Sequence, residues 1–179
     1  MKIIGKIFIL VSALLFQVQA TENNELSMVG LLPQYIEWAK KINQNGLVSG
    51  RALDEKELIL AQEIGIHSPE KVRIVVVDLV PYPYENPALK AMGEAVGFIG
   101  DGIVSNAQAF GYSIYVRKGY DLNRSNLAHE LVHVLQIERA DFASVVTQHV
   151  NDLAKYGYEN SPIEAEAFKA NIKYAIDKN

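Results

Sequence analysis

Apolar residues recur at intervals of three and four along six segments of the chain, which is the spacing of an amphipathic helix. These predicted helices cover residues 31–45, 54–64, 88–96, 126–139, 142–156 and 161–176. Asp54 with Glu57 has the spacing of a capping box, Asn86-Pro87 is a typical helix start, and Gly46 is predicted to end the first helix. The last three helices follow one another directly, so the C-terminal part of the chain is predicted to be entirely helical.

Two segments in the middle of the chain have the pattern of strands. Seven of the nine residues over 72–80 are aliphatic, which predicts a buried strand. Apolar and polar residues alternate over 112–117, whereas the glycine-rich stretch around 97–107 is predicted to form turns. A few strands placed before the main helix of an otherwise helical chain predict an α+β fold in a single domain over residues 21–179.

The first 20 residues have the three-part pattern of a secretory signal peptide. Two lysines precede an apolar run over 7–16, and Val18 and Ala20 stand at the −3 and −1 positions of a cleavage site. A membrane-spanning helix needs about 20 apolar residues, so a run of this length favours a cleaved signal over an anchor. We therefore expect a periplasmic or secreted protein with no stable membrane insertion after cleavage.

Composition narrows the chemistry and the partners. The 179-residue chain has no cysteine, which excludes a disulfide scaffold, a thiolate metal site and a cysteine nucleophile. Its formal charge is −4, and removal of a signal peptide that carries two lysines and no acidic residue would make it −6. An acidic chain without Lys- or Arg-rich runs argues against nucleic acid as the partner.

Residues 129–133 read His-Glu-Leu-Val-His, which is the H-E-x-x-H pattern of zinc peptidases. Residues four apart on a helix share one face, so His129 and His133 can bind one metal ion. Glu130 would flank that metal without binding it, where the general base for a zinc-activated water must lie. A chance pattern on a metal-free helix is the alternative.

A catalytic zinc site needs a third protein ligand, and no further histidine follows His133 in the metzincin spacing. Glu164 and Glu166 on the last predicted helix are the candidates, and they point in directions about 200° apart, so at most one can face the metal. Glu164 could instead complete a capping box with Ser161, which requires no metal. The residues alone leave this choice open.

The motif at 129–133 followed by Glu-Ala-Glu-Ala at 164–167 resembles the gluzincin metallopeptidases, in particular the small single-domain forms called minigluzincins, and this chain would be a small exported bacterial form. The resemblance covers about residues 112–167 and implies a zincin-like fold and peptide-bond hydrolysis, with Glu130 as general base. It implies that Zn²⁺ is held by His129, His133 and Glu164. Phe168 departs from the family pattern, because many gluzincins have there an aspartate that supports a ligating histidine.

The same resemblance implies that an edge strand beside the active-site helix pairs with an extended peptide substrate. The predicted strand over 112–117 is the candidate, and its substrate-binding residues would be Tyr112, Ser113 and Ile114; an internal strand is the alternative.

The positions of two tyrosines make them possible oxyanion donors, and the positions of two further histidines argue against a role as metal ligands. Tyr156 and Tyr158 lie between the two ligand helices, and Tyr158 is the candidate donor to a developing oxyanion. His67 and His149 are predicted to be structural or surface histidines.

Two functions follow from these patterns. The first is an exported zinc metallopeptidase acting on peptides or proteins. The second is a non-catalytic protein on a zincin scaffold that binds a peptide or a cell-envelope partner, which Phe168 and the small size of the chain favour.

Overall fold

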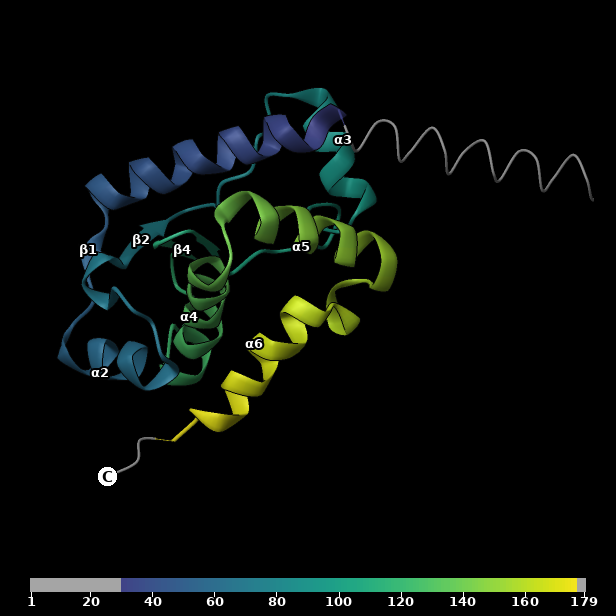
Figure 1. Cartoon of the computed structure of the whole chain (residues 1–179). Coiled ribbons are helices and arrows are strands. Elements are labelled where there is room, and N and C mark those ends of the chain that lie inside the picture. The colour runs from purple at the N-terminus through teal and green to yellow at the C-terminus, as the bar shows by residue number, and fades with distance from the viewer. Residues whose placement is uncertain (1–29, 177–179) are drawn as a thin grey trace, which may run out of the picture. The chain divides into compact units, whose positions relative to one another are not determined.

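The computed structural model describes residues 30–176 of a chain that divides into two units, residues 1–34 and 35–179. The predicted signal peptide, residues 1–20, lies outside the described residues. The second unit contains all the candidate chemistry. Over its described residues it is an α+β fold of helices and one small mixed sheet, as the sequence pattern predicted (Figure 1).

All six predicted helices are present. The first covers residues 30–49, and the others are α2 (Glu55–Ile64), α3 (Pro87–Ala95), α4 (Arg124–Arg139), α5 (Phe142–Tyr156) and α6 (Pro162–Lys173). The capping box of α2 is confirmed, because Asp54 and Glu57 each accept the other's backbone N–H, at 2.9 and 2.8 Å. Among residues 30–176, no helix is both long enough and apolar enough to cross a bilayer.

The sheet has four strands in the order β1-β2-β4-β3. They are β1 (Arg51–Ala52), β2 (Arg73–Val77), β3 (Ala107–Phe110) and β4 (Ser113–Arg117). β2 and β4 run parallel, and the two outer pairings are antiparallel. The strand predicted over 72–80 is shorter than expected and is not buried throughout, because Val76 is 63% exposed.

The position of β4 in the sheet decides between the two alternatives for this strand. It pairs with β2 on one side and with β3 on the other, so it is an internal strand and not an edge. The edge next to it is β3, which begins where the predicted turns end and was not predicted as a strand. An extended substrate therefore cannot pair with β4, since both edges of its backbone already have strand neighbours.

Helix α4 is packed between the sheet and α6 (Figure 1). One buried cluster joins these layers and includes Ile74, Ile114 and Val116 from the sheet, Leu127, Leu131 and Val134 from α4, and Ala167 and Ala170 from α6. The helix that carries the H-E-x-x-H motif is thus held on two sides by the core, and its histidines are presented at a fixed place.

Residues 35–49 of the first helix cover the opposite face of the sheet, and Gly46 allows them to approach closely. A Cβ atom at Gly46 would lie 2.6 Å from Cβ of Ser113, so a larger residue would push the helix away. The helix continues to residue 49, so the prediction that Gly46 ends it is wrong. The Ser113 hydroxyl donates to the carbonyl of Asn43 at 2.8 Å, which fastens this helix to β4.

Candidate metal centre

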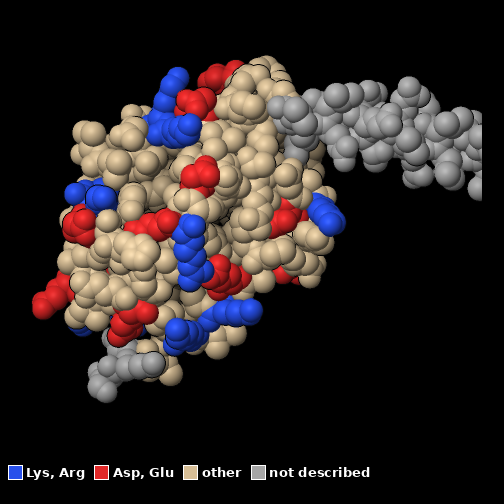
Figure 2. Space-filling model, in the orientation of Figure 1, with Lys and Arg blue, Asp and Glu red and all other residues tan. Residues whose placement is uncertain are grey.

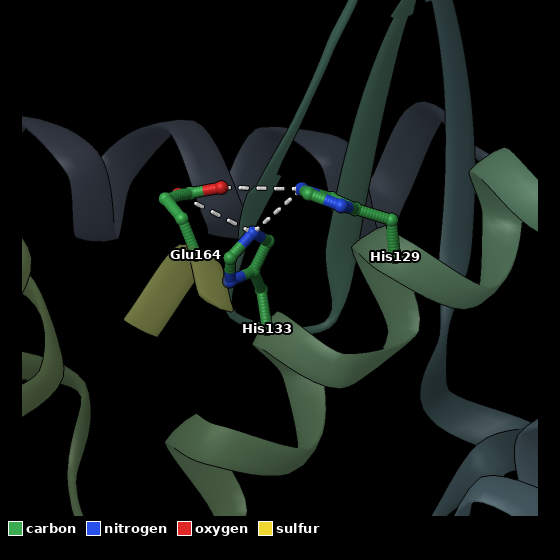
Figure 3. Close-up of side chains that lie close together, drawn as sticks. All are labelled: His129, His133 and Glu164. Carbon is green, nitrogen blue, oxygen red and sulfur yellow. Dashed lines mark hydrogen bonds and ion pairs between the residues drawn. The ribbon is translucent and has the colours of Figure 1, made fainter. Parts of the chain in front are cut away.

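His129 and His133 lie on one face of α4, and Glu164 of α6 points at both of them (Figure 3). The two Nε2 atoms are 3.2 Å apart, and Glu164 oxygens lie 3.3 Å from Nε2 of His129 and 3.6 Å from Nε2 of His133. One potential ligand atom from each residue lies within 4.8 Å of the others. His129 is 8% and Glu164 1% exposed, so these three residues form a buried group that could hold a metal ion.

The structure separates the roles of Glu164 and Glu166. Glu164 faces the two histidines, whereas Glu166 forms an ion pair with Arg139 and accepts a hydrogen bond from Gln136. The alternative that Glu164 forms a capping box with Ser161 is wrong, because the Ser161 side chain makes no capping hydrogen bond. The carboxylate of Glu164 turns inward toward the imidazoles instead.

The tautomer of His129 is set by Asn171 of α6. Nδ1 of His129 lies 3.0 Å from Oδ1 of Asn171. The amide group of Asn171 is oriented in turn, since its Nδ2 donates to the carbonyl of Ser125 at 3.0 Å. The oxygen of Asn171 therefore faces the ring and accepts a hydrogen bond from Nδ1–H, which leaves the lone pair of Nε2 directed at the buried group.

Gln136 sets the tautomer of His133 in the same way. Its Oε1 lies 2.9 Å from Nδ1 of His133, while its Nε2 donates to the carbonyl of Ile163 and to Glu166, both at 3.0 Å. Both histidines thus present Nε2 to the same point, with an amide oxygen behind each ring. Phe168 cannot hold a ligating histidine as the aspartate of many gluzincins does. Asn171 and Gln136 orient the two histidines instead.

The electrostatics of the buried group fit a cation. Burial lowers the pKa of His133, but the carboxylate of Glu164 outweighs it and raises this pKa to about 9. Burial alone raises the pKa of Glu164, yet the imidazoles around it hold this pKa far below its ordinary value. Oε2 of Glu164 is buried and has no hydrogen-bond partner within residues 30–176. A metal ion bound by the three residues would satisfy that oxygen and would take the place of the proton that Glu164 stabilises on His133.

Glu130 lies beside this group and outside it, as the motif predicted. It is 7% exposed, and its carboxylate accepts the backbone N–H of Ala109 in β3. Burial raises the pKa of Glu130, while the two histidines oppose this effect. Its Oε2 has no hydrogen-bond partner among the described residues, so this oxygen is available to a water or a substrate group.

A cavity of about 690 Å³ opens next to the group. Its wall contains His129, Glu130, His133 and Glu164, and most of the rest is apolar, including Phe98, Ile103, Phe110, Phe142, Val146 and Phe168. Among the described residues, no Lys or Arg lines the cavity, and its only acidic residues are Glu130 and Glu164. The cavity therefore suits an uncharged, apolar group placed beside the metal ligands.

All four residues of β3 line the same cavity, and the register shows which backbone groups face it. The N–H of Arg117 donates to the carbonyl of Asn106 at 2.7 Å, so 106 and 117 form a hydrogen-bonded pair. Such pairs alternate along an antiparallel ladder. Ala107 and Ala109 therefore direct their N–H and C=O groups away from β4, toward the open edge.

The three predicted substrate-binding residues are not at this edge, and that prediction is wrong. The Tyr112 hydroxyl donates to Glu138 at 2.7 Å. Ser113 is bonded to the first helix, and Ile114 is completely buried in the core. The alternation of polar and apolar residues located the strand, but it carried no information about the neighbours of that strand.

No family model matches this sequence, and neither a curated protein nor a solved structure is similar enough to match it. The resemblance to gluzincins therefore rests on the two short motifs and stays a prediction.

The tyrosines between the ligand helices differ in position. Tyr158, in the 3-10 turn Tyr158–Asn160, lines the cavity and packs its ring on Phe168, with the ring centroids 5.5 Å apart. Burial, followed by the carboxylates of Glu164 and Glu130, raises the pKa of Tyr158, so its hydroxyl stays protonated and able to donate. The ring of Tyr156 instead lies beneath Lys155 Nζ, 4.8 Å away.

His149 lies beside the metal centre, where the sequence analysis did not place it, just as it did not place Asn171 and Gln136. Its Nε2 lies 2.9 Å from Oε1 of Glu164, but it is not one of the three clustered ligand residues, in agreement with its prediction as a structural or surface residue and not a ligand. The available signal was its spacing: with Val146, Val150 and Leu153 it falls in the apolar stripe of α5. His67 is a surface residue as predicted, with 79% of its side chain exposed.

The distribution of charged side chains on the surface bears on whether nucleic acid could be a partner. Figure 2 shows acidic and basic side chains interspersed on the face in view, with no continuous basic patch among the described residues. This face therefore lacks the clustered positive charge that a phosphate backbone requires.

Proposed function

We propose that this protein is an exported zinc-dependent endopeptidase of the gluzincin type, with a zincin-like fold. One observation carries the proposal: a buried group of two histidines and a glutamate, with Glu130 beside it, forms the wall of a cavity that an open strand edge borders. The predicted signal peptide supports a site of action in the periplasm or outside the cell.

His129, His133 and Glu164 would hold the metal. Nitrogen and oxygen ligands without cysteine are typical of catalytic zinc sites, whereas structural zinc sites are usually rich in thiolate. When bound, Zn²⁺ lowers the pKa of water to about 7 and polarises the carbonyl of the scissile bond.

Glu130 is the proposed general base. Its Oε2, which has no hydrogen-bond partner among the described residues, lies in the wall of the cavity, where it would accept the proton of the attacking water and then pass that proton to the leaving amine. Tyr158, whose hydroxyl stays protonated, is the proposed donor to the oxyanion that develops on the carbonyl oxygen.

The substrate would bind as an extra strand on β3. The outward N–H of Ala107 and C=O of Ala109 offer backbone pairing beside Glu130, which itself accepts the N–H of Ala109, and the apolar cavity would take a large uncharged side chain. The described wall has no Lys or Arg to bind a terminal carboxylate. It also has no carboxylate beyond Glu130 and Glu164 to bind a terminal amine, which favours cleavage within a chain over removal of terminal residues.

The test is cleavage of an internally quenched peptide library by the purified zinc-loaded protein and by Glu130→Gln. We expect the variant to keep its zinc and to lose about 10²–10⁴-fold in turnover, the usual contribution of a general base. Glu55→Gln, an exposed carboxylate of α2, is the matched control and should cleave like the wild type.

Unchanged cleavage by Glu130→Gln would contradict the mechanism. Zinc binding by the wild type without cleavage of any library peptide would instead support the alternative, a non-catalytic protein that binds a peptide or a cell-envelope partner.

A further inference from the structure

A third helix reaches the metal centre through His149 of α5. Its Nε2 lies 2.9 Å from Oε1 of Glu164, which is shorter than the distance from either predicted ligand histidine to this carboxylate. The neighbourhoods of the two Glu164 oxygens therefore differ. Oε1 faces His149 and His133, whereas Oε2 faces His129 and is buried with no hydrogen bond to the part of the chain that the structure describes.

Aromatic rings hold the imidazole of His149 in this place. Phe98 packs edge-on against it with ring centroids 5.3 Å apart, and the ring of His133 lies nearly parallel to it at 6.0 Å. Phe98 is itself packed against Tyr35 and Tyr82, at 6.2 and 6.4 Å. The ring is thus confined on two sides, with its Nε2 directed at Glu164.

His149 is next to the ligand group and is not a member of it. The three residues whose ligand atoms all lie within 4.8 Å of one another are His129, His133 and Glu164. Among the described residues, Nε2 of His149 is a buried atom without an aligned hydrogen bond, although it approaches Oε1 of Glu164. Their separation of 2.9 Å is a hydrogen-bond distance.

We propose that His149 is a positioning residue that assigns the two oxygens of Glu164: Nε2–H of His149 donates to Oε1, and Oε2 is left for the metal. This inference rests on the proposed metal site. A carboxylate between several imidazoles could turn either oxygen, or both, toward a cation. A hydrogen bond to one oxygen removes that freedom, and such supporting bonds are typically worth about 10–100-fold in metal affinity.

The test compares four variants in metal binding, measured by competition with a chromophoric chelator for Zn²⁺ and by the visible absorption of bound Co²⁺. His149→Leu removes the donor and should weaken zinc binding about 10–100-fold and change the Co²⁺ spectrum. His149→Gln places an amide N–H near the position of Nε2 and should restore most of the affinity. His149→Asn is too short to reach Oε1 and should behave like the leucine variant.

His67→Leu is the matched control, because it makes the same change at an exposed histidine and should leave both readouts unchanged. Thermal unfolding of the metal-free proteins establishes that each variant is folded, and the Gln–Asn pair decides the question if the leucine variant is not. Wild-type affinity and spectrum in His149→Leu, or equal affinities in His149→Gln and His149→Asn, would overturn the role of His149 alone. A wild-type protein that binds neither metal would overturn the proposed metal site together with it.

Discussion

Oδ1 of Asn171 lies 3.0 Å from Nδ1 of His129, although the two residues are 42 positions apart and belong to different helices. Because Ser125 holds the amide nitrogen of Asn171, this contact fixes both the ring orientation and the tautomer of His129. Helix α6 thus contributes to the site twice, with Glu164 inside the buried group and with Asn171 behind a histidine. The packing of α4 on α6 therefore stabilises the fold and also positions the residues of the metal centre.

Replacement of Asn171 by leucine keeps the shape of the side chain and removes its acceptor. We expect Asn171→Leu to reduce zinc affinity about 10–100-fold, because Nδ1 of His129 loses its partner and both tautomers become accessible. Isothermal titration of zinc into the metal-free protein measures the change. Asn151→Leu, at an exposed position of α5, is the control, and equal affinities of the two variants would contradict this role of Asn171.

Gln136 connects His133 to Ile163 and Glu166 through a buried amide. Gln136→Met should lower the free energy of unfolding by about 1–3 kcal/mol, because buried hydrogen-bonding groups lose their partners. Arg139→Met, which breaks the exposed ion pair with Glu166, should cost less than about 1 kcal/mol. Urea denaturation of the metal-free proteins compares the two, and a larger loss in Arg139→Met would show that the amide connection is unimportant.

Glu138 provides a stability that depends on pH. Burial alone raises its pKa, but hydrogen bonds from the N–H groups of His67 and Ser68 and from the Tyr112 hydroxyl outweigh burial and lower it. The stabilisation is therefore fully present above the unfolded-state pKa of about 4.3 and is lost as pH falls through the lower folded-state value.

Glu138→Gln should therefore lower the free energy of unfolding by about 1–3 kcal/mol at pH 7. The difference from the wild type should shrink as the pH falls below the unfolded-state pKa. Chemical denaturation at a series of pH values measures it, with Glu70→Gln as an exposed control nearby. A difference that grew toward low pH would have the wrong sign for this account.

The open edge of β3 can be tested with proline. The N–H of Ala107 points away from β4, so Ala107→Pro should fold normally and lose one hydrogen bond to an extended substrate. A bond of about 0.5–1.5 kcal/mol corresponds to a rise of about two- to tenfold in KM. Gln108→Pro removes an N–H that pairs with β4 and should instead destabilise the fold. Normal KM in a folded Ala107→Pro would argue against substrate pairing at this edge.

Local patterns were sufficient for the helices and for part of the site. The periodicity over 142–156 predicted α5 with its observed bounds, since an amphipathic helix needs only its own sequence to show which face is apolar. His129 and His133 were predictable for the same reason, because four residues along a helix fix their relative direction. Glu164 was predictable only together with the resemblance, since its spacing from Ser161 fitted a helix cap equally well.

The other features depend on contacts between distant segments. β3 is Ala-Gln-Ala-Phe between glycine-rich turns, a weak strand pattern that is stabilised by pairing with β4. Whether a strand is internal or at an edge is decided by its neighbours, so the pattern over 112–117 could not show it. His149 and Asn171 reach the site from other turns and helices, and no short motif links them to residues 129–133.

The central claim is that His129, His133 and Glu164 hold one zinc ion, and elemental analysis of the purified protein tests it most directly. Glu164→Gln and Glu166→Gln form a matched pair on the same helix. We predict about one zinc per chain in the wild type and in Glu166→Gln, and little or none in Glu164→Gln. A zinc-free wild type, or a full complement of zinc in Glu164→Gln, would contradict the account.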